Sequence, residues 1–146
     1  MRRTNKLKQI AAKQNKPSTF VIFNPANITY LSGFQGARAL LVPEDGQSVL
    51  YVSGVNCEQA KEEAKDFAVE LIERGEPLME KIAKQASAKK ISVDTLSIEN
   101  WRILAKAVGG EENLELVNDL VKGMRNIKSQ QEIDLIREAC KIADIG

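Results

Sequence analysis

From Val49 onward, short apolar segments alternate with amphipathic ones, and this alternation limits the possible folds more than any other feature of the chain. Strand-like runs occupy residues 49–53, 68–73, 89–94 and 114–117, and helical patterns follow them at 54–67, 76–88, 95–110 and 118–124. Strands that are separated by helices usually pair in parallel, and the helices then cover the faces of the sheet. The second half of the chain therefore predicts an α/β sheet.

The first half adds antiparallel strands to this sheet. A helical pattern at 3–15 precedes a buried strand at Thr19–Phe23. The segment Arg38–Ser53 has two apolar runs on either side of Pro43-Glu44-Asp45-Gly46, and Asp-Gly between such runs favours a hairpin turn. We therefore expect one α/β domain with a mixed sheet, built in three layers with helices on both faces.

Composition excludes several classes of function. The chain has 146 residues, with 43% hydrophobic and 28% charged, which is typical of a globular domain. A net charge of +1 provides no strong field for nucleic acid or for a membrane surface, and no run of 18 apolar residues is present. We expect a cytoplasmic protein that binds neither nucleic acid nor membrane.

The sequence contains no histidine, which removes the commonest general base and metal ligand. Cys57 and Cys140 are the only cysteines, so a zinc site of ordinary spacing is excluded. A nuclease of the ribonuclease H type would need clustered carboxylates. Asp94 ends a predicted strand, but no other acidic strand position converges on it, which disfavours that function.

The stretch "NITYLSGF" at Asn27–Phe34 matches neither a regular helix nor a regular strand. Asn24 is suited to cap a short helix that has Pro25 at its first position. Taken alone, Asn27 suits a local cap or turn. Gly33 suits a backbone conformation that residues with a Cβ adopt less easily. Tyr30, Leu31 and Phe34 suit a core, so the residues leave open whether the stretch is core or site.

The last segment, "SQQEIDLIREACKIADIG", predicts a helix that Ser129 and Glu132 begin with a capping box. One side of this helix carries an apolar stripe, made of Ile133, Ile136, Cys140 and Ala143. The stripe has two interpretations. The segment is either an ordinary terminal helix docked on the sheet, with Gly146 as its cap, or a helix that packs against further protein.

Two motifs resemble the N-terminal part of the creatinase/prolidase/aminopeptidase P family. One is "NITYLSGF", and the other is the linker Arg125-Asn126-Ile127-Lys128-Ser129-Gln130-Gln131-Glu132-Ile133, about 100 residues later. The resemblance concerns the whole chain and implies a creatinase N-terminal domain with a ribonuclease H-like layout at residues 1–124. Residues 125–146 would then be the linker and the first helix of a catalytic domain that lies beyond the chain.

The resemblance implies that this chain performs no catalysis. In the family, two divalent metals, expected here as Mn, Co or Zn, are held by two Asp, one His and two Glu beyond the linker. We expect no catalytic and no metal-binding residue in the chain itself, and no peptidase activity from it alone. The longer protein would be a Xaa-Pro dipeptidase or aminopeptidase.

The family also implies a homodimer in which a loop of this domain covers the partner subunit's substrate pocket. Here that loop is Phe34–Arg38, with Phe34, Gln35 and Arg38 as pocket residues and Arg38 suited to a substrate carboxylate. Asn27, Tyr30 and Gly33 would maintain the motif. Arg125, Lys128 and Glu132 would belong to the linker. The alternative is a free-standing binding or assembly module of the same fold without peptidase activity.

Overall fold

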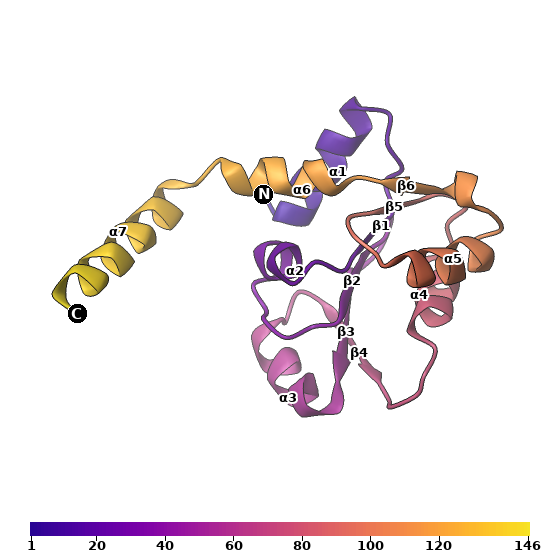
Figure 1. The fold of residues 1–146 in the computed structure, drawn as a ribbon, viewed down its shortest axis with the longest axis horizontal. Helices are drawn as coiled ribbons and strands as arrows, with labels where there is room; N and C mark the ends of the chain where they lie inside the picture. The colour runs from indigo at the N-terminus through magenta and orange to yellow at the C-terminus, as the bar shows by residue number, and fades with distance from the viewer.

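The structure is a computed structural model that describes residues 1–146, and it contains one six-stranded mixed sheet (Figure 1). The strands lie in the order β4-β3-β2-β1-β5-β6. Their bounds are β1 Phe20–Ile22, β2 Ala39–Val42, β3 Val49–Ser53, β4 Ala68–Ile72, β5 Ile91–Val93 and β6 Leu114–Leu116. The helices are α1 Arg3–Lys13, α2 Pro25–Ser32, α3 Gly54–Glu63, α4 Leu78–Ala86, α5 Ile98–Ala107, α6 Asn118–Asn126 and α7 Gln130–Ile145, with a 3₁₀ turn, η1, at Glu111–Asn113.

β2 is the one strand that runs against its neighbours. It pairs antiparallel with β1 and with β3, whereas β3 with β4, β1 with β5 and β5 with β6 are parallel. The predicted hairpin between β2 and β3 is confirmed, and Gly46 in its turn has a φ of 96°, which a residue without a Cβ adopts easily. The predicted mixed α/β sheet is therefore confirmed.

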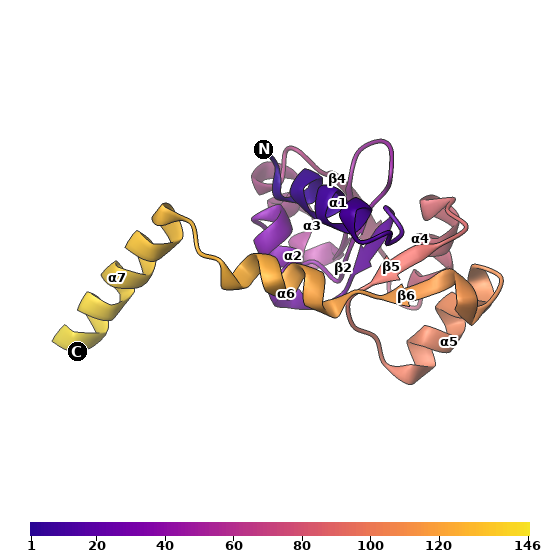
Figure 2. The same cartoon turned by 90° about the horizontal axis from the view of Figure 1, so that it is seen from above.

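The sheet separates two apolar cores because successive side chains of a strand point to opposite faces. In β2, Leu40 and Val42 face the core that α1, α2, α3 and α6 cover, while Ala39 and Leu41 face the core under α4 and α5. Figures 1 and 2 show the two helical layers with the sheet between them. All four β2 residues are buried, as expected for a strand covered on both faces.

The helix boundaries follow from local signals in the sequence. The side chain of Asn24 accepts hydrogen bonds from the backbone amides of Ala26 and Asn27, and Pro25 occupies the first position of α2. Gly33 ends α2 in the left-handed conformation, with φ 76°. "NITYLSGF" is therefore mainly the body and end of a short capped helix.

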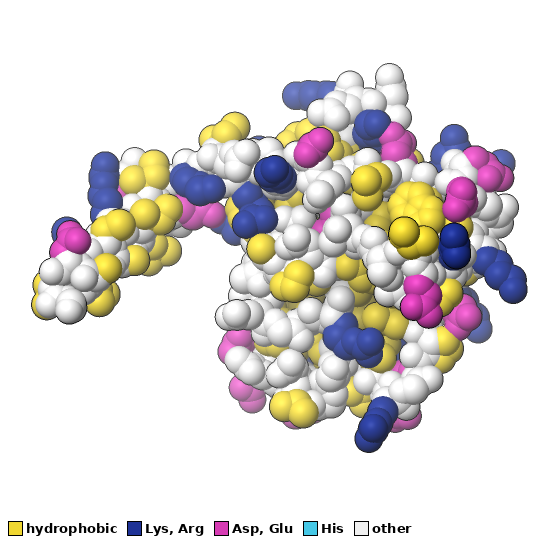
Figure 3. Space-filling view, viewed as in Figure 1, with side chains coloured by type: hydrophobic (Ala, Val, Ile, Leu, Met, Phe, Trp, Pro, Cys, Tyr) yellow, Lys and Arg dark blue, Asp and Glu magenta, His cyan; other side chains and the backbone are white.

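α7 projects away from the rest of the molecule (Figures 1 and 2). The predicted capping box is present, since Ser129 and Glu132 each bond the other's backbone amide. No residue of α7 is buried, so the interpretation of this segment as a helix docked on the sheet is wrong. Figure 3 shows hydrophobic side chains along α7, and the exposed ones include Leu135, Ile136, Ile142 and Ile145. None of the helices combines the length and the apolar character that crossing a membrane would require.

Candidate functional site

The carboxylate of Asp94, directly after β5, is fully buried and accepts four hydrogen bonds. Its Oδ1 accepts from the amides of Phe23, at 2.8 Å, and Thr95, at 2.7 Å. Its Oδ2 accepts from the amide of Asn24, at 3.1 Å, and from Nδ2 of Asn27, at 2.9 Å. Hydrogen bonds to an ionised acceptor are stronger than neutral ones, so this carboxylate fixes the start of α2 against the end of β5.

Asn27 joins the two sequence motifs. Its Nδ2 donates to Asp94, and its Oδ1 accepts a hydrogen bond of 3.1 Å from the guanidinium of Arg125, in the last turn of α6. Asn27 is 1% exposed, and Asn24 rather than Asn27 provides the helix cap. The interpretation of Asn27 as a local cap or turn residue is therefore wrong, because it connects three separate elements.

Tyr30 contacts both α6 and Arg3, and Arg3 reaches α7. Its hydroxyl donates to the carbonyl of Met124 at 3.3 Å, and the guanidinium carbon of Arg3 lies 4.0 Å from its ring centroid. Arg3 also donates to the carbonyl of Tyr30, at 2.7 Å, and to Oε1 of Glu132, at 2.9 Å. One cation thus stacks on an aromatic face and holds the first turn of α7.

Glu132 takes part in both the cap of α7 and this contact. The backbone hydrogen bond from Ser129 lowers the pKa of Glu132 below its ordinary value of 4.5, and the charge of Arg3 adds to the effect. Lys128 donates to the carbonyl of Arg125. The three predicted linker residues, Arg125, Lys128 and Glu132, therefore lie together at the junction between α6 and α7, which we call the linker junction.

The predicted pocket loop lies between α2 and β2. Phe34 is fully buried in the core under α2, so its side chain is not available to another subunit's pocket. Gln35 and Arg38 are exposed, and Arg38 has no side-chain hydrogen bond or ion pair within the chain, while its backbone amide donates to the carbonyl of Tyr51 at 2.8 Å. The carbonyl of Gly36 accepts a hydrogen bond of 3.1 Å from Asn56, which ties the loop to α3.

The chain's own residues do not fit a two-metal centre. No three His, Cys, Asp or Glu side chains lie close enough together to hold one metal ion, and Asp94 already accepts four hydrogen bonds from protein donors. The two cysteines are free, Cys57 buried and Cys140 exposed. The hydrogen bonds of Arg125 and Asn56 can orient the linker and present the loop between α2 and β2.

The sequence pattern does not indicate two residues that make these contacts, Arg3 and Asp94. Arg3 is one of several basic residues in the first helix, and nothing in its spacing indicates a contact 129 positions away. For Asp94 the sequence suggested only a possible metal ligand. Its position directly after a strand was the available signal, because a carboxylate there can accept from amides at the same edge of the sheet.

The fold and the linker junction together define a mixed α/β domain from which a capped helix, α7, projects. The family model described as the creatinase/prolidase N-terminal domain matches residues 3–127, and the chain belongs to this family. The Xaa-Pro dipeptidase of Pyrococcus furiosus is 32% identical over 136 residues, which cover 90% of this chain and 37% of that protein.

Solved structures agree with this assignment. The prolidase of Pyrococcus horikoshii has a TM-score of 0.79 at 27% identity, covering 97% of this chain and 40% of that one. The N-terminal domain of the cytoplasmic peptidase PepQ from Mycobacterium tuberculosis has a TM-score of 0.66 at 33% identity, covering 83% of this chain and 96% of that one. The chain spans 37% to 42% of the length of the first curated relatives that it matches.

Proposed function

We propose that this chain is the non-catalytic N-terminal domain of a metal-dependent Xaa-Pro dipeptidase or aminopeptidase. The observation that carries the proposal is the family match over residues 3–127, together with relatives that are named Xaa-Pro dipeptidase. The linker and the unburied α7 support it, since a helix with exposed Leu135 and Ile142 suits packing against further protein. We expect the two divalent metals, Mn, Co or Zn, to be bound by residues beyond the linker.

In this proposal the domain pairs with a second subunit and completes that subunit's substrate pocket. Gln35 and Arg38 are the pocket residues, and Phe34 supports the loop from the core. An unpaired guanidinium on a loop that is fixed by Tyr51 and Asn56 suits the free carboxylate of a short peptide, because it can donate two parallel hydrogen bonds. We place this function in the cytoplasm, by analogy with the relative described as a cytoplasmic peptidase.

The experiment compares Arg38→Ala with Arg102→Ala in a full-length protein that carries this domain. Arg102 is an exposed cation on α5, on the opposite face of the sheet, so it controls for loss of one positive charge. We expect kcat/KM of Arg38→Ala to fall about tenfold for Xaa-Pro substrates with a free C-terminus, and to change little for amidated ones. Equal kcat/KM for wild type and Arg38→Ala on both substrates would contradict the pocket role.

Two further measurements test the rest of the proposal. Light scattering should give a dimer mass for the full-length protein. The isolated chain should hydrolyse no Xaa-Pro dipeptide, with or without added Mn²⁺ or Co²⁺, whereas metal-dependent hydrolysis by it would place the catalytic groups in this domain. A full-length protein that binds such peptides without cleaving them would instead favour a binding or assembly module.

A further inference from the structure

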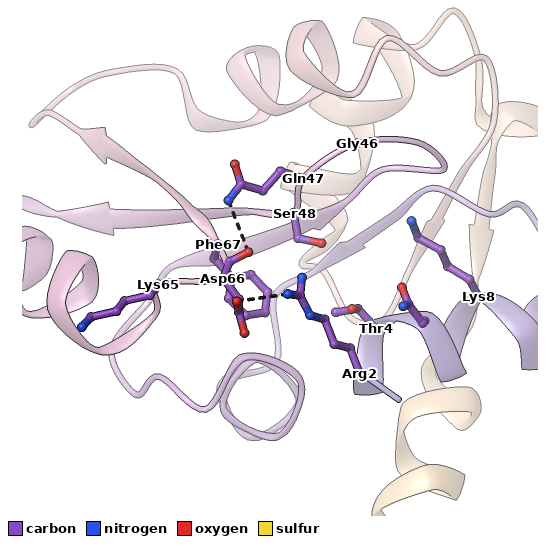
Figure 4. A pocket seen from close by; sticks show the side chains of 10 residues that line it. Arg2, Thr4, Lys8, Gly46, Gln47, Ser48, Lys65, Asp66 and Phe67 are labelled. Atoms are coloured by element: carbon purple, nitrogen blue, oxygen red, sulfur yellow. Dashed lines mark hydrogen bonds and ion pairs between the residues drawn. The ribbon is translucent and has the colours of Figure 1, made fainter.

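A pocket at the start of α1 has no place in the proposed peptidase function. It has a volume of about 330 Å³, within the range of small-ligand sites, and only one of its ten lining residues is hydrophobic. The lining comes from α1 and its preceding residue, from the turn before β3, and from the segment between α3 and β4 (Figure 4). We call it the α1 pocket, and the residues that matter here are Arg2, Thr4, Asn5, Lys8, Ser48 and Asp66.

The first turn of α1 presents free backbone donors to this pocket. The cap residue, Arg2, makes no side-chain capping bond, and the first turn contains no acidic residue. The first helical hydrogen bond runs from the amide of Lys6 to the carbonyl of Arg2, so the amides of Arg3, Thr4 and Asn5 have no partner within the helix. Such a helix end attracts anions through its free amides and its positive dipole end.

Thr4 adds a polar group that has no partner within the chain. The residue is only 7% exposed, and no group of the chain hydrogen-bonds its hydroxyl. The structure contains no fully enclosed side-chain polar atom without a partner, so this hydroxyl must reach an opening, and the opening that Thr4 lines is the α1 pocket. Figure 4 places Thr4 beside Arg2, facing the pocket. Because it has no partner in the chain, this hydroxyl is free to bond water or a ligand in the pocket.

The charges around Thr4 favour an anion. Arg2 and Lys8 both line the pocket, and the amine of Lys8 donates to the carbonyl of Glu44 in the turn between β2 and β3, at 2.9 Å. The single carboxylate, Asp66, is paired with Arg2 at 3.1 Å. Lys65 lies at the rim, with its amine directed away from the pocket in Figure 4, and therefore adds only to the surrounding field. The hydroxyl of Ser48 gives a further donor on the opposite wall.

We propose that the α1 pocket binds a phosphate group, carried by inorganic phosphate or by a small phosphomonoester. Three oxygens would accept from the free amides of α1 and from the hydroxyls of Thr4 and Ser48. Arg2 and Lys8 would balance the charge, as cationic side chains do at many phosphate sites. A dianionic group suits this set better than a carboxylate, because the donors outnumber the two oxygens of a carboxylate.

The test is an amide NMR titration of the chain with inorganic phosphate, at pH 7 and at ionic strength held constant with chloride. We expect saturable shifts that are largest at Thr4 and Asn5. Lys8→Gln should weaken the apparent affinity about fivefold or more, and Lys13→Gln should leave it unchanged, because Lys13 lies in the last turn of the same helix. Asp66→Asn should strengthen binding, since it removes the competing carboxylate from Arg2.

Thr4→Val tests the hydroxyl at nearly constant side-chain volume, and it should weaken binding while the spectrum stays folded. A parallel titration with glycerol phosphate separates a free phosphate from a phosphomonoester, and saturation by either supports the proposal. Shifts that do not saturate, that spread evenly over the surface, or that are equal in Lys8→Gln and Lys13→Gln would overturn it.

Discussion

Replacing Asp94 by Asn tests whether the buried carboxylate holds the motif helix. An asparagine fills the same space, but its NH₂ group would face the amide of Asn24 or the side-chain amide of Asn27, which are themselves donors. Two charge-assisted hydrogen bonds are lost, each contributing about 1.5–3 kcal/mol. Asn27 could rotate its amide to recover one bond, but it would then direct an NH₂ group at the guanidinium of Arg125. We therefore expect a loss of about 4 kcal/mol.

The loss is measured by urea and thermal unfolding at pH 7, followed by circular dichroism. For a chain of this size it corresponds to a decrease in Tm of about 10 °C. Asp144→Asn is the matched control, since it removes an exposed carboxylate near the end of α7 and should change stability by less than about 0.5 kcal/mol. An unfolding free energy for Asp94→Asn within about 1 kcal/mol of wild type would refute the reasoning.

Three further predictions concern the ends of α2 and α7. Gly33→Ala should destabilise the domain by about 1–2 kcal/mol, because Gly33 has a φ of 76°, while Gly123→Ala, inside α6, should stabilise it by about 0.5–1 kcal/mol in the same urea titration. Destabilisation by both variants would contradict this assignment of backbone strain. Arg3→Ala should speed hydrogen exchange of the first amides of α7, because it removes the 2.9 Å contact to Glu132, and unchanged exchange would show that the contact contributes nothing. The pKa of Glu132 is lowered in the folded chain, so its stabilisation of α7 is complete above pH 4.5 and is lost as the pH falls through the folded pKa. Amide shifts of α7 between pH 6 and pH 3 should therefore change more in wild type than in Glu132→Gln, and an equal change would exclude this role.

Features that depend on near neighbours could be predicted from the sequence. The hairpin turn at Gly46, the cap of α2 by Asn24 and the capping box at Ser129 each depend on residues within four positions. The alternation after Val49 predicts the parallel strands, because strands and helices differ in the spacing of their apolar residues. The apolar pattern extends the strands up to two residues beyond their observed ends, as for Lys89–Asp94 against the observed Ile91–Val93.

The order of the strands and the linker junction were not predictable in this way. Nothing in the local pattern indicates that β5 pairs with β1, since Phe20 and Ser92 meet only through the packing of the whole sheet. The same applies to the bond between Arg125 and Asn27, which are 98 positions apart. The two motifs could be recognised separately, but their contact required the fold. The pocket loop remains a prediction, now limited to Gln35 and Arg38 because Phe34 lies in the core.

The position of β5 has a consequence for the order in which the chain can mature on the ribosome. β1, β2 and β3 are consecutive and can form a meander early, but the other edge of β1 remains open until residues 91–93 have been made. The amides of Phe23 and Asn24 likewise await an acceptor that lies 71 and 70 positions later. Nascent chains arrested shortly before Asp94 emerges should therefore be more sensitive to protease at β1 and α2 than chains arrested shortly after it.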